Sequence, residues 1–313
     1  MPAIVVHTVG KSILFGEHAV VYGYPAIAVP IPALKTTVTI FPLIGKEQQV
    51  SIYDAPDLAI SAKLSDLPEN NVLVHAVKLF KDAYAISTIP SFRLKIKSHI
   101  PVASGLGSSA SVSVGVVKAL SQFLGLKLPV QKINDFAFEL EKLHHGNPSG
   151  IDNTVISYEK ALCFTKGLEP EFLQSPTPFH ILLIDSGIAS HTVEVVSAVK
   201  QARENDPQTI NSIFQEIGEI TQSAKKAFLR GNAQELGGLM QRNHALLQAL
   251  HVSLPELDTL VSLALNNGAW GAKLCGAGRG GNVIALVGEE NAPFIQQALV
   301  SHGVKGIVHT VIQ

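Results

Sequence analysis

The chain has 313 residues, 46% of them hydrophobic and 16% charged, and a globular chain of this length buries a core without disulfide or metal staples. Its net charge of −1, with no basic stripe or acidic tail, argues against nucleic acid as the main partner. The two cysteines, Cys163 and Cys275, lie far apart without CxxC spacing, so we expect a reduced, cytoplasmic protein with no cysteine-based zinc site.

The first half of the chain mixes strands, loops and helices. Residues 91–97 alternate cleanly, with apolar Phe92, Leu94 and Ile96 on one side and basic residues on the other, which is typical of a half-buried strand. Hydrophobic periodicity gives the remaining predictions for this half: strands at 4–9, 13–15 and 36–41, and helices at 71–84, 108–124 and 130–144.

The second half is richer in helices. A polar, proline-rich stretch at 166–178 is the predicted boundary between an N-terminal nucleotide-binding and catalytic domain, residues 1–168, and a C-terminal α+β domain, residues 169–313. Beyond this stretch we predict strands at 179–185, at both ends of 271–288 and at 304–312, with helices at 192–204, 208–229, 233–250, 255–266 and 292–302. The mixture predicts an α+β fold in both halves.

No segment of the sequence favours a membrane or a secretory route. The N-terminus lacks the basic region of a signal peptide, and the charge-free stretch 18–34 contains three prolines that would break a spanning helix. The other charge-free stretch, 98–117, is too rich in serine and glycine to stay in hydrocarbon. We therefore expect a soluble protein that does not bind membranes.

The segment PVASGLGSSAS, residues 101–111, follows a predicted strand and precedes a predicted helix. Gly105 and Gly107 allow the backbone to take positive φ angles and to approach a ligand closely. Ser108 and Ser109 then fall at the helix start, where free N–H groups and the helix dipole favour phosphate, and their hydroxyls could bind Mg²⁺. The segment lacks the lysine of a Walker A motif, and a flexible loop with a capping serine is the alternative interpretation.

Two further stretches carry polar residues in unusual settings. GKSILFGEHAVVYG, residues 10–23, embeds Lys11, Glu17 and His18 in apolar sequence, where unpaired charges are costly, although an edge strand could let them reach water. ELEKLHHGNPSGIDN, residues 139–153, is a helix end running into a loop that bears Asp152, and ordinary helix termination is its alternative explanation.

Together these three stretches resemble the galactokinase–homoserine kinase–mevalonate kinase–phosphomevalonate kinase (GHMP) superfamily. A fourth match, KLCGAGRGGNVIAL at 273–286, resembles its C-terminal glycine-rich motif, although Arg279 interrupts the usual run of glycines and puts the geometry of that loop in doubt. The motifs run in the family's order from residue 11 to residue 286, so the resemblance covers nearly the whole chain. It implies a two-domain α+β fold with the active site in the cleft between the domains.

Within the superfamily the signatures are most similar to the mevalonate kinase family, which implies roles for individual residues. Asp152 matches the catalytic base and Lys11 the lysine beside it, while Ser109 and Glu141 match the Mg²⁺ ligands. Residues of the phosphate loop match the part that binds ATP: Ser104, Gly105, Leu106, Gly107, Ser108, Ser109, Ala110 and Ser111. Substrate-side positions are matched by Glu17, His18 and, more weakly, Thr192, for which a plain helix N-cap is the alternative.

The resemblance implies ATP-dependent phosphorylation of the C5 hydroxyl of mevalonate, with Mg²⁺ as cofactor and a homodimer as the oligomeric state. Phosphoryl transfer needs positioning and charge neutralisation, which this set of residues could supply. Two alternatives remain open at this stage. One is a sister kinase acting on phosphomevalonate, a sugar or homoserine, and the other is a catalytically silent relative that only binds ligands.

Overall fold

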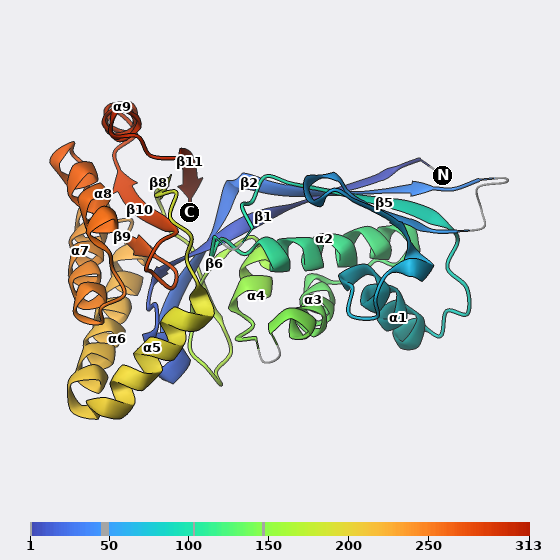
Figure 1. The fold of residues 1–313 in the computed structure, drawn as a ribbon, viewed down its shortest axis with the longest axis horizontal. Helices are drawn as coiled ribbons and strands as arrows, with labels where there is room; N and C mark the ends of the chain where they lie inside the picture. The colour runs from blue at the N-terminus through green and yellow to red at the C-terminus, as the bar shows by residue number, and fades with distance from the viewer. Residues whose placement is uncertain (1, 45–49, 103, 146–147) are drawn as a thin grey trace. The chain divides into compact units, whose positions relative to one another are not determined.

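The structure, a computed structural model, describes residues 2–44, 50–102, 104–145 and 148–313. Figure 1 shows helices and strands along the whole chain. The strands are β1 Ile4–Phe15, β2 Ala26–Pro42, β3 Ile52–Ala55, β4 Ile60–Lys63, β5 Phe92–Ser98, β6 Ala161–Phe164, β7 Glu171–Leu173, β8 Phe179–Asp185, β9 Gly271–Cys275, β10 Asn282–Val287 and β11 Gly306–Ile312. The helices are α1 Val72–Tyr84, α2 Ser108–Phe123, α3 Val130–His145, α4 Ile151–Tyr158, α5 Thr192–Asn205, α6 Pro207–Leu229, α7 Ala233–Ala249, α8 Pro255–Asn266 and α9 Ala292–His302.

The chain folds into two compact units that are interleaved in sequence. Unit 1 comprises Met1–Gly10, Leu34–Val102 and Gly107–Glu159. Unit 2 comprises Lys11–Ala33, Ala103–Leu106 and Lys160–Gln313. From the sequence we expected one boundary, between domains 1–168 and 169–313. In the structure each unit is built from three separate segments, and the long strands β1 and β2 each contribute residues to both units.

In unit 1, helices pack against one face of a mixed β-sheet. β5 pairs antiparallel with the second half of β2 and parallel with β3. Phe92, Leu94 and Ile96 of β5 are buried and the basic residues between them are exposed, which confirms the predicted alternation. In Figure 1, α1 to α4 lie on one side of these strands, and α1, α2 and α3 supply apolar side chains to the same core as β5.

The strand β2 begins earlier than the predicted strand at 36–41. Its segment Ala26–Ala28 pairs with β6, and its segment Thr36–Pro42 pairs with β5. Pro30 and Pro32 lie between these two segments, so neither ladder needs the N–H groups that proline lacks. The same strand can therefore run through two prolines.

In unit 2, a four-stranded sheet with the order β11-β8-β10-β9 is covered by helices. All neighbouring strands pair antiparallel. Alternate residues of β8, β9 and β10 enter one apolar core together with α5 to α9, as expected for a sheet with a helical layer. The predicted α+β fold is confirmed in both units.

Helix α7 closes the open edge of this sheet. Gln241 donates from its side-chain amide to the Trp270 carbonyl at 3.1 Å, and the Leu274 N–H donates to His244 Nδ1 at 3.3 Å. The backbones approach so closely that a Cβ placed on Gly237 would lie 2.4 Å from the Trp270 oxygen. Backbone polar groups along this edge of the sheet therefore form hydrogen bonds with side chains of α7 rather than with another strand.

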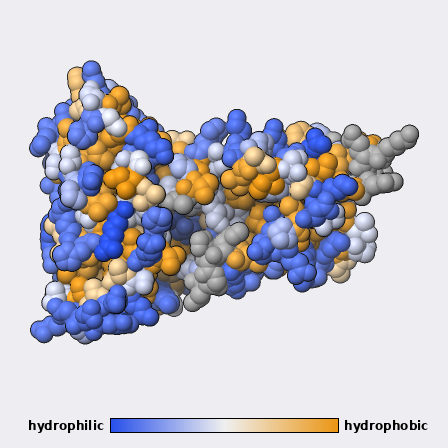
Figure 2. All heavy atoms as spheres, in the orientation of Figure 1, coloured by the Kyte–Doolittle hydropathy of each residue, from blue (hydrophilic) through white to orange (hydrophobic). Residues whose placement is uncertain are grey.

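Among the described residues, no helix is both long enough and apolar enough to cross a bilayer. Figure 2 shows hydrophilic side chains mixed with hydrophobic ones over the face it presents. Exposed large apolar residues such as Val193 and Phe294 occur singly in the chain, which is normal for a folded protein.

Candidate active site

The phosphate-loop serines lead into α2, whose first turn offers backbone donors. Gly105 and Gly107 both have positive φ, 76° and 75°, as predicted from the sequence. Gly107 is the N-cap residue, so no N-cap side chain covers the N–H groups of the first turn. Such a helix start favours an anion through its free N–H groups and its dipole. Ser108, Ser109 and Ala110 form this first turn.

The serines at the start of α2 form different hydrogen bonds within unit 1. Ser109 Oγ donates to Glu141 Oε1 at 2.9 Å, and Ser113 Oγ donates to the same oxygen at 2.8 Å. Ser111 is buried, with its hydroxyl 2.8 Å from Thr8 Oγ1, and so ties α2 to β1. Ser109 and Glu141 were each predicted as a Mg²⁺ ligand, and the hydrogen bond between them was not predicted. Ser113 was missed although it stands four residues after Ser109 on the same helical face.

Glu141 and Asp152 line one pocket of about 250 Å³ in unit 1. Pro148, Ser149, Gly150 and Asn153 complete its lining. Glu141 is 3% exposed, and its Oε1 accepts hydrogen bonds from the hydroxyls of Ser109 and Ser113. The structure therefore brings a predicted metal ligand and the predicted base to one cavity.

Asp152 lies in the first turn of α4, where the sequence suggested only a loop. Gly150 caps this helix with a φ of 84°, and the helix dipole stabilises a carboxylate placed there. Asn153 fixes the start of α4 by donating to Asn134 Oδ1 of α3 at 2.6 Å. Residues 146 and 147 of the same motif lie outside the described residues.

The Glu17–Ala19 segment of unit 2 forms a strained three-residue turn. The Ala19 N–H donates to the Glu17 carbonyl at 2.7 Å, and His18 between them has φ 62° and ψ −49°. A γ-turn with positive φ is rare and costs of order 1–3 kcal/mol for a residue other than glycine. Strain of this kind persists where the surrounding structure imposes it, and such places are commonly functional sites.

His18 is held by the glycine-rich turn of unit 2. Its Nε2 lies 2.8 Å from the Ala277 carbonyl, which can only accept, so Nε2 carries the proton. Burial lowers the pKa of His18, with smaller contributions from the neighbouring Lys273 and Arg279 charges. The ring is therefore neutral near pH 7, with Nδ1 left as an acceptor.

Glu17 forms a buried ion pair with Lys273, a residue that the sequence interpretation missed. Lys273 Nζ donates to Glu17 Oε1 and, at 2.8 Å, to the Leu274 carbonyl. The side chains are 0% and 2% exposed. A lysine inside the apolar strand GAKLC was the available signal, because a buried ammonium requires a partner.

The glycine-rich turn after β9 connects to the start of the phosphate loop within unit 2. Asn282 donates from its side-chain amide to the Ser104 carbonyl at 3.0 Å, and the Lys11 N–H donates to the Leu106 carbonyl at 3.0 Å. Arg279 takes a left-handed φ of 51°, and its exposed side chain donates from Nε to the His251 carbonyl. The arginine thus fits the turn without crowding it.

Lys11 and Thr192 complete the predicted set in unit 2. Lys11 lies in β1 and is buried, with 6% of its surface exposed. Thr192 is exposed and is the first residue of α5, whose N-cap is His191, so the alternative of a threonine N-cap was wrong. The predicted residues thus form two groups: Gly107 to Ser111, Glu141 and Asp152 in unit 1, and Lys11, Glu17, His18, Ser104 to Leu106 and Thr192 in unit 2.

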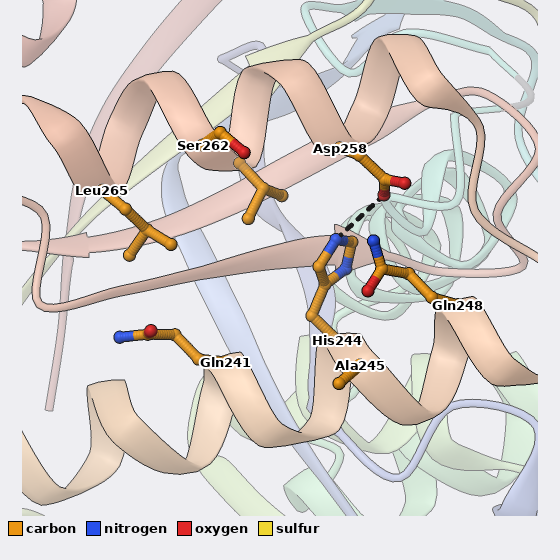
Figure 3. Close-up of a pocket in the computed structure, with 8 residues that line it drawn as sticks. Gln241, His244, Ala245, Gln248, Asp258, Ser262 and Leu265 are labelled. Carbon is orange, nitrogen blue, oxygen red and sulfur yellow. Dashed lines mark ion pairs between the residues drawn. The ribbon is translucent and has the colours of Figure 1, made fainter.

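A second pocket, of about 240 Å³, lies between α7 and α8 in unit 2 (Figure 3). His244 Nε2 is 3.1 Å from Asp258 Oδ1, while Nδ1 accepts the Leu274 N–H. Burial lowers the pKa of His244, although Asp258 opposes this shift. The histidine thereby links two helices to the edge strand, and we assign it a structural role.

Comparison with known proteins places this geometry in a family. The model of the GHMP kinases N terminal domain matches residues 71–160, and that of the GHMP kinases C terminal domain matches 224–305. A mevalonate kinase of Pyrococcus furiosus is 36% identical over 88% of this chain and 86% of its own length. The mevalonate kinase of Thermococcus gammatolerans is 33% identical, covering 94% of this chain and 92% of the relative.

The chain belongs to the GHMP kinase family. It is therefore an ATP-dependent kinase. The crystal structure of Methanococcus jannaschii mevalonate kinase matches it with a TM-score of 0.87 and 31% identity, covering 100% of this chain and 99% of the other. The L. major mevalonate kinase in complex with R-mevalonate has a TM-score of 0.83 and 28% identity, with coverage of 99% and 96%.

In this GHMP kinase, the two family models cover different groups of the candidate residues. The N-terminal match contains the start of α2, Glu141 and Asp152, and the C-terminal match contains Lys273 and the glycine-rich turn. A galactokinase of Lactococcus lactis, at 21% identity and a TM-score of 0.77 over 99% of this chain and 93% of its own, shares the fold alone.

Proposed function

We propose that the protein transfers the γ-phosphate of ATP to the C5 hydroxyl of mevalonate, giving 5-phosphomevalonate and ADP. One observation carries the proposal: curated mevalonate kinases are 33–36% identical to this chain over most of its length. A kinase of this kind contributes to the synthesis of isoprenoid precursors.

The phosphate loop is the proposed binding site for the ATP phosphates. Residues 104–111 supply two glycines with positive φ and the uncovered first turn of α2. Backbone N–H groups at a helix start bind phosphate without a lysine. In this proposal Ser104 to Leu106 and Gly107 to Ala110 surround the phosphates, while Ser111 supports the helix from behind through Thr8.

Asp152 is the proposed general base. It lines the unit 1 pocket and lies at the start of α4, where its carboxylate can accept the proton of an attacking alcohol. Lys11 of unit 2 balances the negative charge that develops during transfer, because phosphoryl transfer depends on positioning and charge stabilisation. On the substrate side we place Glu17, His18 and Thr192.

Glu141 and Ser109 suit a magnesium ion. Mg²⁺ prefers oxygen ligands and in kinases is held by one or two carboxylates together with substrate phosphates. Glu141 and Ser109 supply a buried carboxylate and a hydroxyl 2.9 Å apart beside the proposed phosphate site. When bound, Mg²⁺ would neutralise charge on the ATP phosphates.

We also propose a cytoplasmic location, because both cysteines are buried and unpaired, as in a reducing compartment. Mevalonate and ATP are the partners in this proposal, without nucleic acid or membrane. The homodimer stays a prediction from the family resemblance.

The experiment is a coupled ADP-release assay with mevalonate, phosphomevalonate, galactose and homoserine as acceptors. We expect turnover with mevalonate and none above background with the others. Asp152→Asn should keep its fold and ATP binding but lose about 10²–10⁴-fold in turnover, the usual contribution of a positioned base. Preference for another acceptor would overturn the substrate, and near-normal turnover of Asp152→Asn would remove that residue from catalysis.

A further inference from the structure

Two histidines of unit 2 meet across neighbouring strands, and the proposed function uses neither of them. His180 lies on β8, and His309 lies on β11, the edge strand of the four-stranded sheet. In the antiparallel register Val311 stands opposite His180, so His309, two residues earlier, is the diagonal neighbour of His180 on the same face. Diagonal neighbours on a sheet come within reach of each other when their side chains are long or aromatic.

The two imidazole rings meet through ring nitrogens. His180 Nδ1 lies 3.2 Å from His309 Nε2, and the ring centroids are 5.4 Å apart. Zinc–imidazole bonds measure about 2.0–2.1 Å, so two nitrogens at a tetrahedral angle around one ion stand about 3.3–3.4 Å apart. The observed separation is therefore close to that of two histidines that share a zinc ion. A small rotation of the rings would direct both nitrogen lone pairs at one point.

Glu289 lies beside the other ring nitrogen of His180. Its Oε2 is 3.8 Å from His180 Nε2. A carboxylate in this position favours the tautomer with the proton on Nε2, which leaves a lone pair on Nδ1, the nitrogen that faces His309. Histidines that bind metal ions commonly offer their second ring N–H to a carboxylate, which fixes the tautomer and the ring orientation. The three side chains have the same arrangement.

The protonation and the accessibility of the pair also suit a metal ion. Burial and the neighbouring His180 lower the pKa of His309, although Glu289 opposes this shift. The His309 ring is therefore uncharged at neutral pH, as a metal ligand has to be. The side chain of His180 is 16% exposed and that of Glu289 is 81% exposed, so an ion can reach the pair from solvent.

We propose that His180 Nδ1 and His309 Nε2 bind a Zn²⁺ ion across β8 and β11, and that Glu289 is the positioning residue of His180. Among the described residues no group of three or more His, Cys, Asp or Glu side chains is arranged to hold a metal ion, so water completes the coordination of the zinc. Imidazole suits zinc, whereas Mg²⁺ prefers oxygen ligands. This inference goes beyond the proposed function, because it concerns a different ion and different residues.

The bound ion would stabilise the folded chain through its edge strand. β11 pairs with β8 alone in this sheet and is the last element of the chain. An ion that joins the two strands binds the folded state and not the unfolded one, so it shifts the unfolding equilibrium towards the folded chain. We therefore expect Zn²⁺ to raise the urea midpoint of unfolding.

The test is a Zn²⁺ titration of the purified protein at about pH 7.5, where the imidazoles are uncharged, without nucleotide and with excess Mg²⁺ to occupy oxygen-rich sites. Long-range proton–nitrogen NMR of the histidine rings identifies the nitrogens that bind. We expect one zinc ion to shift the signals of His180 Nδ1 and His309 Nε2 together, and the urea midpoint to rise with the same zinc dependence.

Three variants separate the roles. His309→Gln changes an exposed strand residue, so it should fold like wild type but lose both the zinc-induced shift at His180 and the rise of the urea midpoint. Glu289→Gln keeps both ligands and should weaken zinc binding about tenfold or more, the usual effect of losing an outer carboxylate. His7→Gln is the matched control, because His7 is also an exposed strand histidine but contacts only Thr37, and it should bind zinc like wild type.

Wild-type zinc affinity in His309→Gln overturns the inference. So does a titration in which zinc shifts other histidines and leaves the rings of His180 and His309 unchanged, because the pair would then be a hydrogen bond only. Unchanged affinity in Glu289→Gln removes the positioning role of Glu289. Because the titration contains no substrate, its result does not depend on which reaction the protein catalyses.

Discussion

At the scale of single residues, Glu141 is the carboxylate that the account needs for magnesium. Its Oε1 accepts from Ser109 and Ser113, so its orientation is fixed before any ligand binds. We expect Glu141→Gln to raise the Mg²⁺ concentration for half-maximal activity at least about tenfold, because a neutral amide binds a hard cation more weakly than a carboxylate does. A Mg²⁺ titration measures this.

The control is Glu139→Gln, two residues earlier on α3, where Glu139 forms a partly exposed pair with Lys142. That variant should titrate like wild type. If Glu141→Gln also shows an unchanged Mg²⁺ requirement, Glu141 does not belong to the metal site.

Candidate site residues could be picked out from the sequence where they stand inside a motif, whereas a partner that only folding brings near could not. Ser109, Glu141 and Asp152 stand inside recognisable motifs, and the structure brings the last two to one pocket. Lys273 stands 256 residues from Glu17, and no local pattern shows such a partner. Long-range pairing of buried charges depends on the tertiary fold, which residue spacing does not reveal.

At the scale of elements, the contact between α7 and β9 makes a sharp prediction from two adjacent glycines. A Cβ on Gly237 would meet the Trp270 backbone, whereas a Cβ on Gly238 would meet nothing within 4 Å. Gly238→Ala should stabilise the protein by about 0.5–1 kcal/mol, since alanine favours helix. Gly237→Ala should destabilise it by about 1–3 kcal/mol through overpacking. Urea unfolding of both variants measures this, and equal stabilisation would contradict the close approach of α7 to β9.

Element prediction failed where tertiary context overrides local signals. The segment 26–35 contains two prolines, yet it belongs to the continuous strand β2 because each proline lies outside the ladders to β5 and β6. The Asp152 segment looked like a loop because it is rich in glycine, asparagine and proline, but α4 begins directly after Gly150. The amphipathic helices and β5 were predictable because their apolar faces repeat regularly.

At the scale of the whole molecule, stability should fall under mildly acidic conditions. Burial is the main effect that lowers the pKa of His18, His244 and His309 below the ordinary value of 6.5. Below that value the unfolded chain binds more protons at these sites than the folded chain, so the free energy of unfolding decreases as pH falls. The raised pKa of Glu17 acts in the opposite direction, so a difference measurement isolates one histidine.

That measurement compares wild type with His244→Asn, in which the asparagine oxygen can still accept the Leu274 N–H. Urea unfolding between about pH 7.5 and 5.5 should show a shallower pH dependence for the variant. Identical pH dependence would mean that His244 takes up its proton equally in the folded and unfolded chains.

The two units are interleaved along the chain, and a single boundary in the sequence cannot describe such an arrangement. A polar stretch suggests where a chain leaves one domain, but it cannot show that Lys11–Ala33 and Ala103–Leu106 belong with the later residues. The chain passes from one unit to the other within the long strands β1 and β2, each of which contributes residues to both units.

The proposed reaction is a phosphoryl transfer to the C5 hydroxyl of mevalonate and not to its C3 hydroxyl. Phosphorus NMR of a reaction of the purified protein with ATP, Mg²⁺ and mevalonate tests it most directly. We predict a new phosphate monoester whose signal couples to the C5 methylene protons, together with ADP. An uncoupled ester on the tertiary C3 oxygen, or the release of inorganic phosphate alone, would contradict the account.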